Sequence, residues 1–169
     1  MTWGQFGAAI DMLENAIRAC PEALWSDPEK RPALVPHDVV GFWYVAFHAA
    51  FWLDLYLADS YESYRPPDGF TRDDREEGYL PERPYTRESV LDLLASGRER
   101  CRRVIAAMSD AEAEAPCGFP WLKLSRGELL LYNLRHVQHH AAQLNLLLRQ
   151  GVDAAPRWVA ETSVPLGGA

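Results

Sequence analysis

Apolar residues recur along much of this chain with the spacing of α-helices. Within residues 3–19 they lie three or four positions apart, at Phe6, Ile10, Leu13 and Ile17. This is the period of one helix face, so a first helix is predicted there. Pro21 should end it, because proline disfavours helical backbone at the preceding residue. One further short turn of helix is expected at 22–25, within a proline-rich connection.

A second helix is predicted from residues 36–37 to about Asp59. It is apolar on nearly every side: Val39, Val40, Phe42, Trp43, Val45, Phe47, Phe51, Trp52, Leu53 and Leu55. A helix without a polar face is covered on most sides, by its neighbours in the fold or by a second subunit. The apolar run at 39–53 is too short to span a bilayer and contains His48, so we interpret it as a buried helix.

The third and fourth helices are indicated by their start signals. Thr86 is expected to cap a third helix that runs to about residue 108. Ser125, followed three residues later by Glu128, has the pattern of a capping box at the start of a fourth helix. That helix should run to residues 149–150, with Gly151 as its C-terminal stop.

Two long connections and a tail complete the predicted organisation. Residues 60–85 are rich in proline, glycine and tyrosine, and a loop of this length is typically functional or mobile. In residues 109–124, Pro116, Gly118 and Pro120 are expected to prevent any helix. Residues 152–169 should form an irregular tail anchored by Trp158 and Val159. The pattern predicts an all-α fold, a four-helix bundle with long inter-helix loops that forms one domain over residues 1–169.

The composition argues against some classes of binding partner. The formal net charge of −7 argues against nucleic-acid and anionic-membrane binding, both of which require basic surfaces. The three cysteines form no Cys-x-x-Cys pair, which is typical of reduced thiols in a cytoplasmic protein. The first residues lack the basic and apolar regions of a signal peptide. We therefore expect a cytoplasmic protein that acts on a small molecule.

Candidate chemistry is concentrated in residues 136–143, His-Val-Gln-His-His-Ala-Ala-Gln. His136 and His140 are four residues apart, which places both imidazoles on one face of the fourth helix, one turn apart. Two imidazoles so placed can bind one metal ion, and the ion keeps open positions if one more ligand comes from elsewhere. His139 points about 100° away from His140 and is expected at the surface or an interface.

His48 is the candidate for the third ligand, because it lies among large apolar residues of the second helix. Burying an imidazole without a partner costs about 1–3 kcal/mol. Three histidines that face one bundle core could satisfy one another through a divalent metal. Histidines bonded to core tyrosine or asparagine side chains are the metal-free alternative. Val137 stands where the His-Glu-x-x-His motif of metalloproteases requires glutamate, and His37 is expected to be solvated.

Residues 131–152, Leu-Tyr-Asn-Leu-Arg-His-Val-Gln-His-His-Ala-Ala-Gln-Leu-Asn-Leu-Leu-Leu-Arg-Gln-Gly-Val, resemble the last core helix of the DinB/YfiT-like family. The family pattern is a histidine, three residues, then His-x-x-Gln and an apolar continuation that ends in Arg-Gln-Gly. His136, His140 and Gln143 match it, and His48 matches the family's remaining histidine in the second helix. The resemblance implies a four-helix bundle, usually a homodimer, with a divalent metal held by these three histidines.

The same resemblance implies the class of activity. Members with known activity include S-transferases and isomerases that use mycothiol, bacillithiol or glutathione. A metal-dependent enzyme is thus the leading hypothesis, specifically an S-transferase that uses a low-molecular-weight thiol, with zinc, nickel, iron or manganese as the ion. A metal-dependent hydrolase, and a non-enzymatic stress-related bundle with a structural or vestigial site, are the alternatives. Gln143, Asn133 and Tyr44 are candidates for contacts to the ligands or the substrate.

Overall fold

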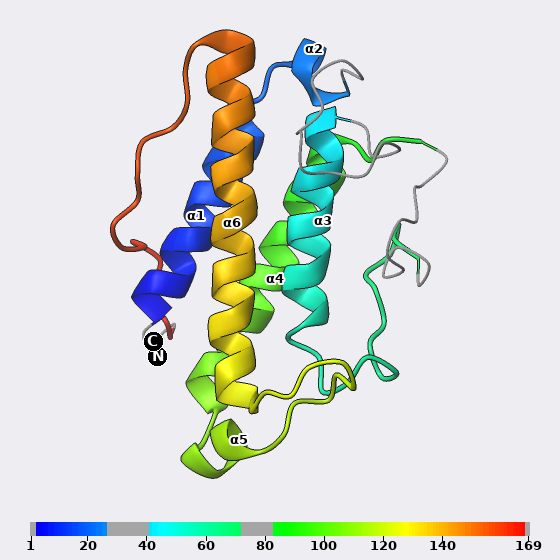
Figure 1. Ribbon diagram of the computed structural model, residues 1–169, viewed down its shortest axis with the longest axis vertical. Helices are drawn as coiled ribbons and strands as arrows, with labels where there is room; N and C mark the ends of the chain where they lie inside the picture. The colour runs from blue at the N-terminus through cyan, green and yellow to red at the C-terminus, as the bar shows by residue number, and fades with distance from the viewer. Residues whose placement is uncertain (1–2, 27–40, 72–82, 168–169) are drawn as a thin grey trace.

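A computed structural model describes residues 3–26, 41–71 and 83–167 of the chain. The long helices are α1 (Trp3–Ala19), α3 (Gly41–Leu55), α4 (Arg87–Ala107) and α6 (Arg126–Val152), and the short ones are α2 (Glu22–Trp25) and α5 (Asp110–Glu114). Figure 1 shows the four long helices side by side. α6 packs against both α1 and α3, and α4 closes the bundle by packing against the other sides of these two helices. The described residues contain no strand, so the predicted all-α bundle is confirmed.

The helix starts follow the sequence signals, whereas one predicted end is wrong. The Thr86 side chain accepts a hydrogen bond from the Ser89 backbone N–H, and Ser125 forms the expected capping box with Glu128. α6, however, runs through Gly151 and ends before Asp153, which has a left-handed φ of 57°. A Cβ at Gly151 would lie 3.0 Å from a methyl carbon of Leu24 in α2. This glycine therefore permits close packing of α2 and does not terminate the helix.

The apolar surface of α3 is covered within the chain. α3 ends at Leu55, four residues before the predicted end, and the predicted start at 36–37 lies outside the described residues. Phe47, 2% exposed, stacks on Phe70 with ring centroids 5.9 Å apart and contacts Tyr85 at 4.7 Å. These rings come from the connection between α3 and α4. Most of the apolar surface of the described part of α3 is therefore covered within the chain, and only Tyr44, His48 and Trp52 stay partly exposed. The homodimer stays a prediction.

The connection from α4 to α6 corrects another expectation, because it contains the five-residue helix α5. Ser109 and Glu112 form a capping box at its start, the same signal that begins α6. Pro116 follows the helix and leaves it intact. After it, Gly118 passes so close to the end of α3 that a Cβ would lie 2.0 Å from the Asp59 carbonyl oxygen. The connection is thereby fixed against the base of the bundle.

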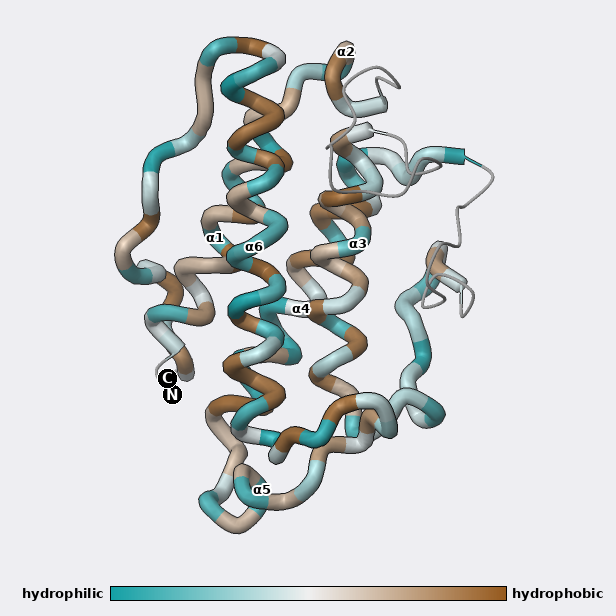
Figure 2. The backbone as a smooth tube through the Cα atoms, viewed as in Figure 1, coloured by the Kyte–Doolittle hydropathy of each residue, from teal (hydrophilic) through white to brown (hydrophobic). Residues whose placement is uncertain are grey.

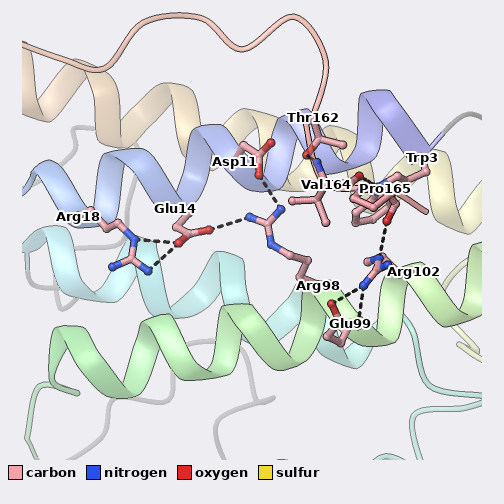
Figure 3. A network of polar contacts seen from close by, with 10 residues as sticks. All are labelled: Trp3, Asp11, Glu14, Arg18, Arg98, Glu99, Arg102, Thr162, Val164 and Pro165. Atoms are coloured by element: carbon pink, nitrogen blue, oxygen red, sulfur yellow. Dashed lines mark hydrogen bonds and ion pairs between the residues drawn. The ribbon is translucent and has the colours of Figure 1, made fainter. Parts of the chain in front are cut away.

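The C-terminal tail is irregular after Asp153, as predicted, and one of its two predicted anchors is confirmed. Val159 packs against the edge of the core, whereas Trp158 is 68% exposed and does not anchor the tail. The firm contacts come later in the tail and reach the start of α1. The Thr162 N–H donates to the Gly4 carbonyl at 3.1 Å, and the Trp3 indole N–H donates to the Val164 carbonyl at 2.6 Å. Figure 3 shows these tail residues beside α1 and α4.

Buried charges hold α4 to both of its neighbours. Arg98 of α4 forms ion pairs with Asp11 and Glu14 of α1 (Figure 3). On the other side, the fully buried Asp54 of α3 pairs with Arg100 at 3.1 Å. Burial raises the pKa of Asp54, and the Arg100 guanidinium opposes that shift. The ionised form of this carboxylate therefore depends on Arg100.

The Arg100→Met variant should lower the free energy of unfolding by about 3 kcal/mol at pH 7, because it leaves a buried carboxylate without its cation. Urea unfolding of wild type, Arg100→Met, Asp54→Asn and the double variant would measure the coupling. The double variant should lose less stability than the sum of the two single losses. Additive losses would show that the pair is not coupled in the folded state.

Candidate metal centre

Three imidazole rings from two helices meet at the contact between α3 and α6. The Nε2 atom of His136 lies 3.2 Å from Nε2 of His48 and 3.1 Å from Nε2 of His140. One nitrogen from each ring lies within 4.8 Å of the other two, so the cluster could hold a metal ion. The structure thus brings together the three histidines that the sequence singled out.

The packing of α6 sets the direction of its two rings. Val137, Ala141 and Leu144 are fully buried and define the side of α6 that faces the core. His136 and His140 lie at the border of that side and are only partly buried. Both rings contact His48 of α3, so they lie at the contact between the two helices. Figure 2 shows the alternating polar and apolar positions along α6 that produce this border.

Gln143 fixes the proton position on one of these rings. Its side-chain oxygen Oε1 lies 2.7 Å from Nδ1 of His140. An amide oxygen can only accept a hydrogen bond, so Nδ1 carries the proton and Nε2 keeps its lone pair. That lone pair points toward the other rings. Gln143 therefore does what was expected of it, because it orients a candidate ligand.

Hydrogen bonds between neutral imidazoles cannot satisfy all the other ring nitrogens of the cluster. Nε2 of His136 faces two other Nε2 atoms and carries one proton at most. The buried Nδ1 of His136 has no hydrogen-bond partner among the described residues. A cation at the meeting point would accept all three lone pairs. The observed separations are close to the edge of about 3.3 Å expected for a tetrahedral site with Zn–N bonds of about 2.0–2.1 Å, so the residues fit a divalent ion.

Desolvation keeps the three rings neutral. Burial lowers the pKa of His48 to about 3, that of His136 to about 2 and that of His140 to about 4. Repulsion from the neighbouring imidazoles lowers these pKa values further, whereas the hydrogen bond to Gln143 opposes the shift at His140. Neutral imidazole is the form that binds metals, so the cluster is ready to bind at neutral pH.

The comparison with protein families agrees with the geometry. A family model of the DinB superfamily matches residues 5–144, a range that includes the three histidines and Gln143. The chain belongs to the DinB superfamily. Searches of curated proteins and of solved structures each found no match. Within the described ranges, no helix of this DinB-superfamily chain is long and apolar enough to cross a membrane.

Aromatic rings surround the cluster and restrain its imidazoles. Tyr44, a predicted contact residue, stacks on His48 with centroids 6.2 Å apart, and Trp52 lies against the same ring at 5.9 Å. The ring of Tyr56 meets His136 nearly perpendicularly at 6.2 Å. Trp52 and Tyr56 were missed in the sequence. Trp52, four residues after His48, lies on its face of α3, and Tyr56, eight residues after His48, continues that face directly after the helix ends.

Two other polar residues of α6 lie near the cluster without joining it. The buried Asn133 was a candidate contact residue, but its amide donates to the Leu53 carbonyl at 3.0 Å and so connects α6 to the α3 backbone. His139 is exposed, as predicted, and its ring stands edge-on to that of His140 at 5.2 Å. His37 lies outside the described residues.

A groove of about 550 Å³ runs along the outer side of α6 and gives access to His136. Its lining contains Tyr132, Arg135, Gln138 and His139, and none of its described lining residues is acidic. The histidine cluster of this DinB-superfamily chain therefore has one imidazole, that of His136, at the border of the groove and beside the Arg135 guanidinium group. A centre that is open on one side is typical of catalytic metal sites, whereas structural sites are closed.

The Gln143→Leu variant should bind zinc about 10–100-fold more weakly than wild type, because His140 loses the partner that fixes its proton on Nδ1. Competition with a chromophoric chelator would measure the affinity. Gln138→Leu is the matched control, since the Gln138 amide contacts Met12 and no imidazole. Equal affinities for the two variants would contradict this role of Gln143.

Zinc binding at pH 6 should release almost no protons, because lowered pKa values leave all three rings neutral at that pH. Imidazoles with an ordinary pKa of about 6.5 would together release about two protons. Isothermal titration calorimetry in buffers of different ionisation enthalpy counts the protons. Release of two protons per zinc would show that the rings are not desolvated.

Proposed function

We propose that this protein is a divalent-metal-dependent enzyme, an S-transferase that uses a low-molecular-weight thiol. In this proposal His48, His136 and His140 hold the ion. The convergence of three Nε2 atoms, with the proton of His140 held on the opposite nitrogen by Gln143, is the observation that carries it. Membership of the DinB superfamily, together with the resemblance described above, supports the transferase class.

Neutral ligands determine what a bound ion would supply. Three imidazoles leave its +2 charge uncompensated, so it would lower the pKa of a thiol or a water molecule toward neutrality. The protein's part is to hold the imidazoles neutral and oriented. Trp52 and Tyr44 restrain His48, and Tyr56 restrains His136.

In this proposal the thiol comes from outside the protein, because two of its cysteines are poor nucleophiles and none belongs to the histidine cluster. Cys20 and Cys101 are buried free thiols, and burial raises the pKa of Cys20 to about 12 and that of Cys101 further still. Such thiols are inert. Cys117 is partly buried, and its sulfur faces the Leu122 carbonyl at the base of the bundle. None of the three belongs to the histidine cluster.

The groove beside His136 provides space for the reactants. Tyr132 offers a hydroxyl there, and Arg135 offers a positive charge that has no ion-pair partner among the described residues. An anionic group on the thiol or on its acceptor would be attracted to this side of α6. The open groove favours catalysis over a purely structural metal site.

The test is transfer of a thiol to monochlorobimane, in which the sulfur–carbon bond forms, chloride leaves and the thiol proton passes to the buffer. Mycothiol, bacillithiol and glutathione would be tried in turn. We expect fluorescence to form at an enzyme-dependent rate that is lost on chelation and restored by a divalent metal. The His136→Ala, His140→Ala double variant should be inactive, although it remains folded by circular dichroism.

The contrary outcomes are distinct. S-transfer that is unaffected by chelation would overturn the role of the metal. Metal-dependent ester hydrolysis without any thiol would replace the transferase by a hydrolase. Bound metal without turnover, combined with a large fall in the melting temperature on chelation, would indicate a structural site.

A further inference from the structure

A second cavity is lined by residues from the end of α4, from α5 and from the start of α6. Figure 1 shows that these three segments meet at the base of the bundle. It has a volume of about 370 Å³, and three arginines line it: Arg100 and Arg103 from α4, and Arg126 from α6. Arg126 precedes His136 by ten residues, about 15 Å along the axis of α6. The cavity shares no described lining residue with the histidine cluster.

Two of these guanidinium groups have hydrogen-bond donors to spare. Arg103 is exposed and forms no hydrogen bond or ion pair with any described residue. Arg126 pairs with Asp59 at 3.2 Å, but the Asp59 side chain is 84% exposed, and such a pair contributes little because water screens it. Arg100 is already bound to the buried Asp54.

Glu112 is the one acidic residue among the described lining residues, and its carboxylate is occupied. Its Oε2 accepts hydrogen bonds from the Ser109 backbone N–H at 2.8 Å and from the Ser109 hydroxyl at 2.7 Å. Two of the three guanidinium groups thus have carboxylate partners outside the lining, Arg100 with Asp54 and Arg126 with Asp59, so the charges around the cavity are nearly balanced. Arg103 has no such partner among the described residues, and the exposed pair with Asp59 leaves Arg126 available to an anion.

An apolar slot adjoins this cavity. The slot has a volume of about 20 Å³ and shares Val104, Met108 and Arg126 with the larger cavity. Beyond them its lining includes Leu129 and Leu130 at the start of α6. The slot itself has room for only about one methyl-sized group. The larger cavity thus offers guanidinium donors together with hydrocarbon contact from Val104 and Met108.

We propose that the base of the bundle is a binding site for a small amphipathic anion, a monocarboxylate with a short aliphatic chain. The carboxylate lies between Arg103 and Arg126, since a guanidinium group matches the two oxygens of a carboxylate. The chain lies against Val104 and Met108 within the larger cavity, and only its terminal methyl group reaches the slot. A single negative charge fits better than two, because the carboxylates of Glu112 and Asp59 are close by.

Calorimetric titration of hexanoate into chelator-treated protein tests the proposal. The chelator removes any metal, so binding at the histidine cluster cannot be mistaken for this site, and the outcome does not depend on the proposed enzyme activity. Hexanoate should bind, and the neutral hexanamide should bind at least about tenfold more weakly, because it lacks the charge. Acetate should also bind more weakly, by a few-fold for each missing methylene group.

Variants locate the site. Arg103→Gln and Arg126→Gln should each weaken hexanoate binding by about tenfold, since each removes a charged donor. Arg149→Gln, which removes an exposed charge at the other end of α6, should bind like wild type. Three results would overturn the proposal: no binding at low-millimolar hexanoate, equal binding of hexanamide, or undiminished binding by both cavity variants. Tighter binding of hexyl phosphate would overturn the preference for a monoanion.

Discussion

The contact between α3 and α6 is the constraint on which the metal centre depends. One of the three imidazoles lies on α3 and two lie on α6, so neither helix can assemble the cluster alone. The hydrogen bond from the Asn133 amide to the Leu53 carbonyl fixes the position of α6 along the axis of α3. A slip of α6 by one turn would move its imidazoles about 5.4 Å, well beyond the separations of 3.1–3.2 Å between the ring nitrogens.

Burial disfavours the charged form of every ionisable side chain in this bundle, and the outcome depends on whether an opposite charge lies beside it. Arg98 and Asp54 are buried beside opposite charges on neighbouring helices, and their ion pairs connect α4 to α1 and α3. The three histidines contact one another and aromatic rings, and no described carboxylate lies against them, so burial lowers their pKa values and they are neutral. The same loss of solvent is thus opposed by a counter-charge at Asp54 and unopposed by any described counter-charge at the imidazoles.

The sequence predicts those features that depend on spacing along one helix. The four-residue interval between His136 and His140 and the capping box at Ser125 are of this kind. Features that depend on distant segments were not predicted, except for His48, which its place among apolar residues and the family resemblance joined to His136 and His140. The rings of Phe70 and Tyr85 cover α3 from a connection without periodicity, and nothing in the sequence pairs Asp54 with Arg100. The prediction that α6 stops at Gly151 was wrong because glycine occurs both at helix ends and where two helices pack closely.

The order in which the chain is made bears on how this bundle can close. α1, the first helix, packs against α6, the last, and its first residue, Trp3, is bonded to the Val164 carbonyl 161 positions later. The side of α1 that packs on α6 therefore stays uncovered during synthesis until residues 126–152 have been made. α3 and α4 can pair earlier, and α4 can also cover part of α1. Until α6 is made, the nascent chain exposes an apolar helix face, the kind of surface that chaperones bind.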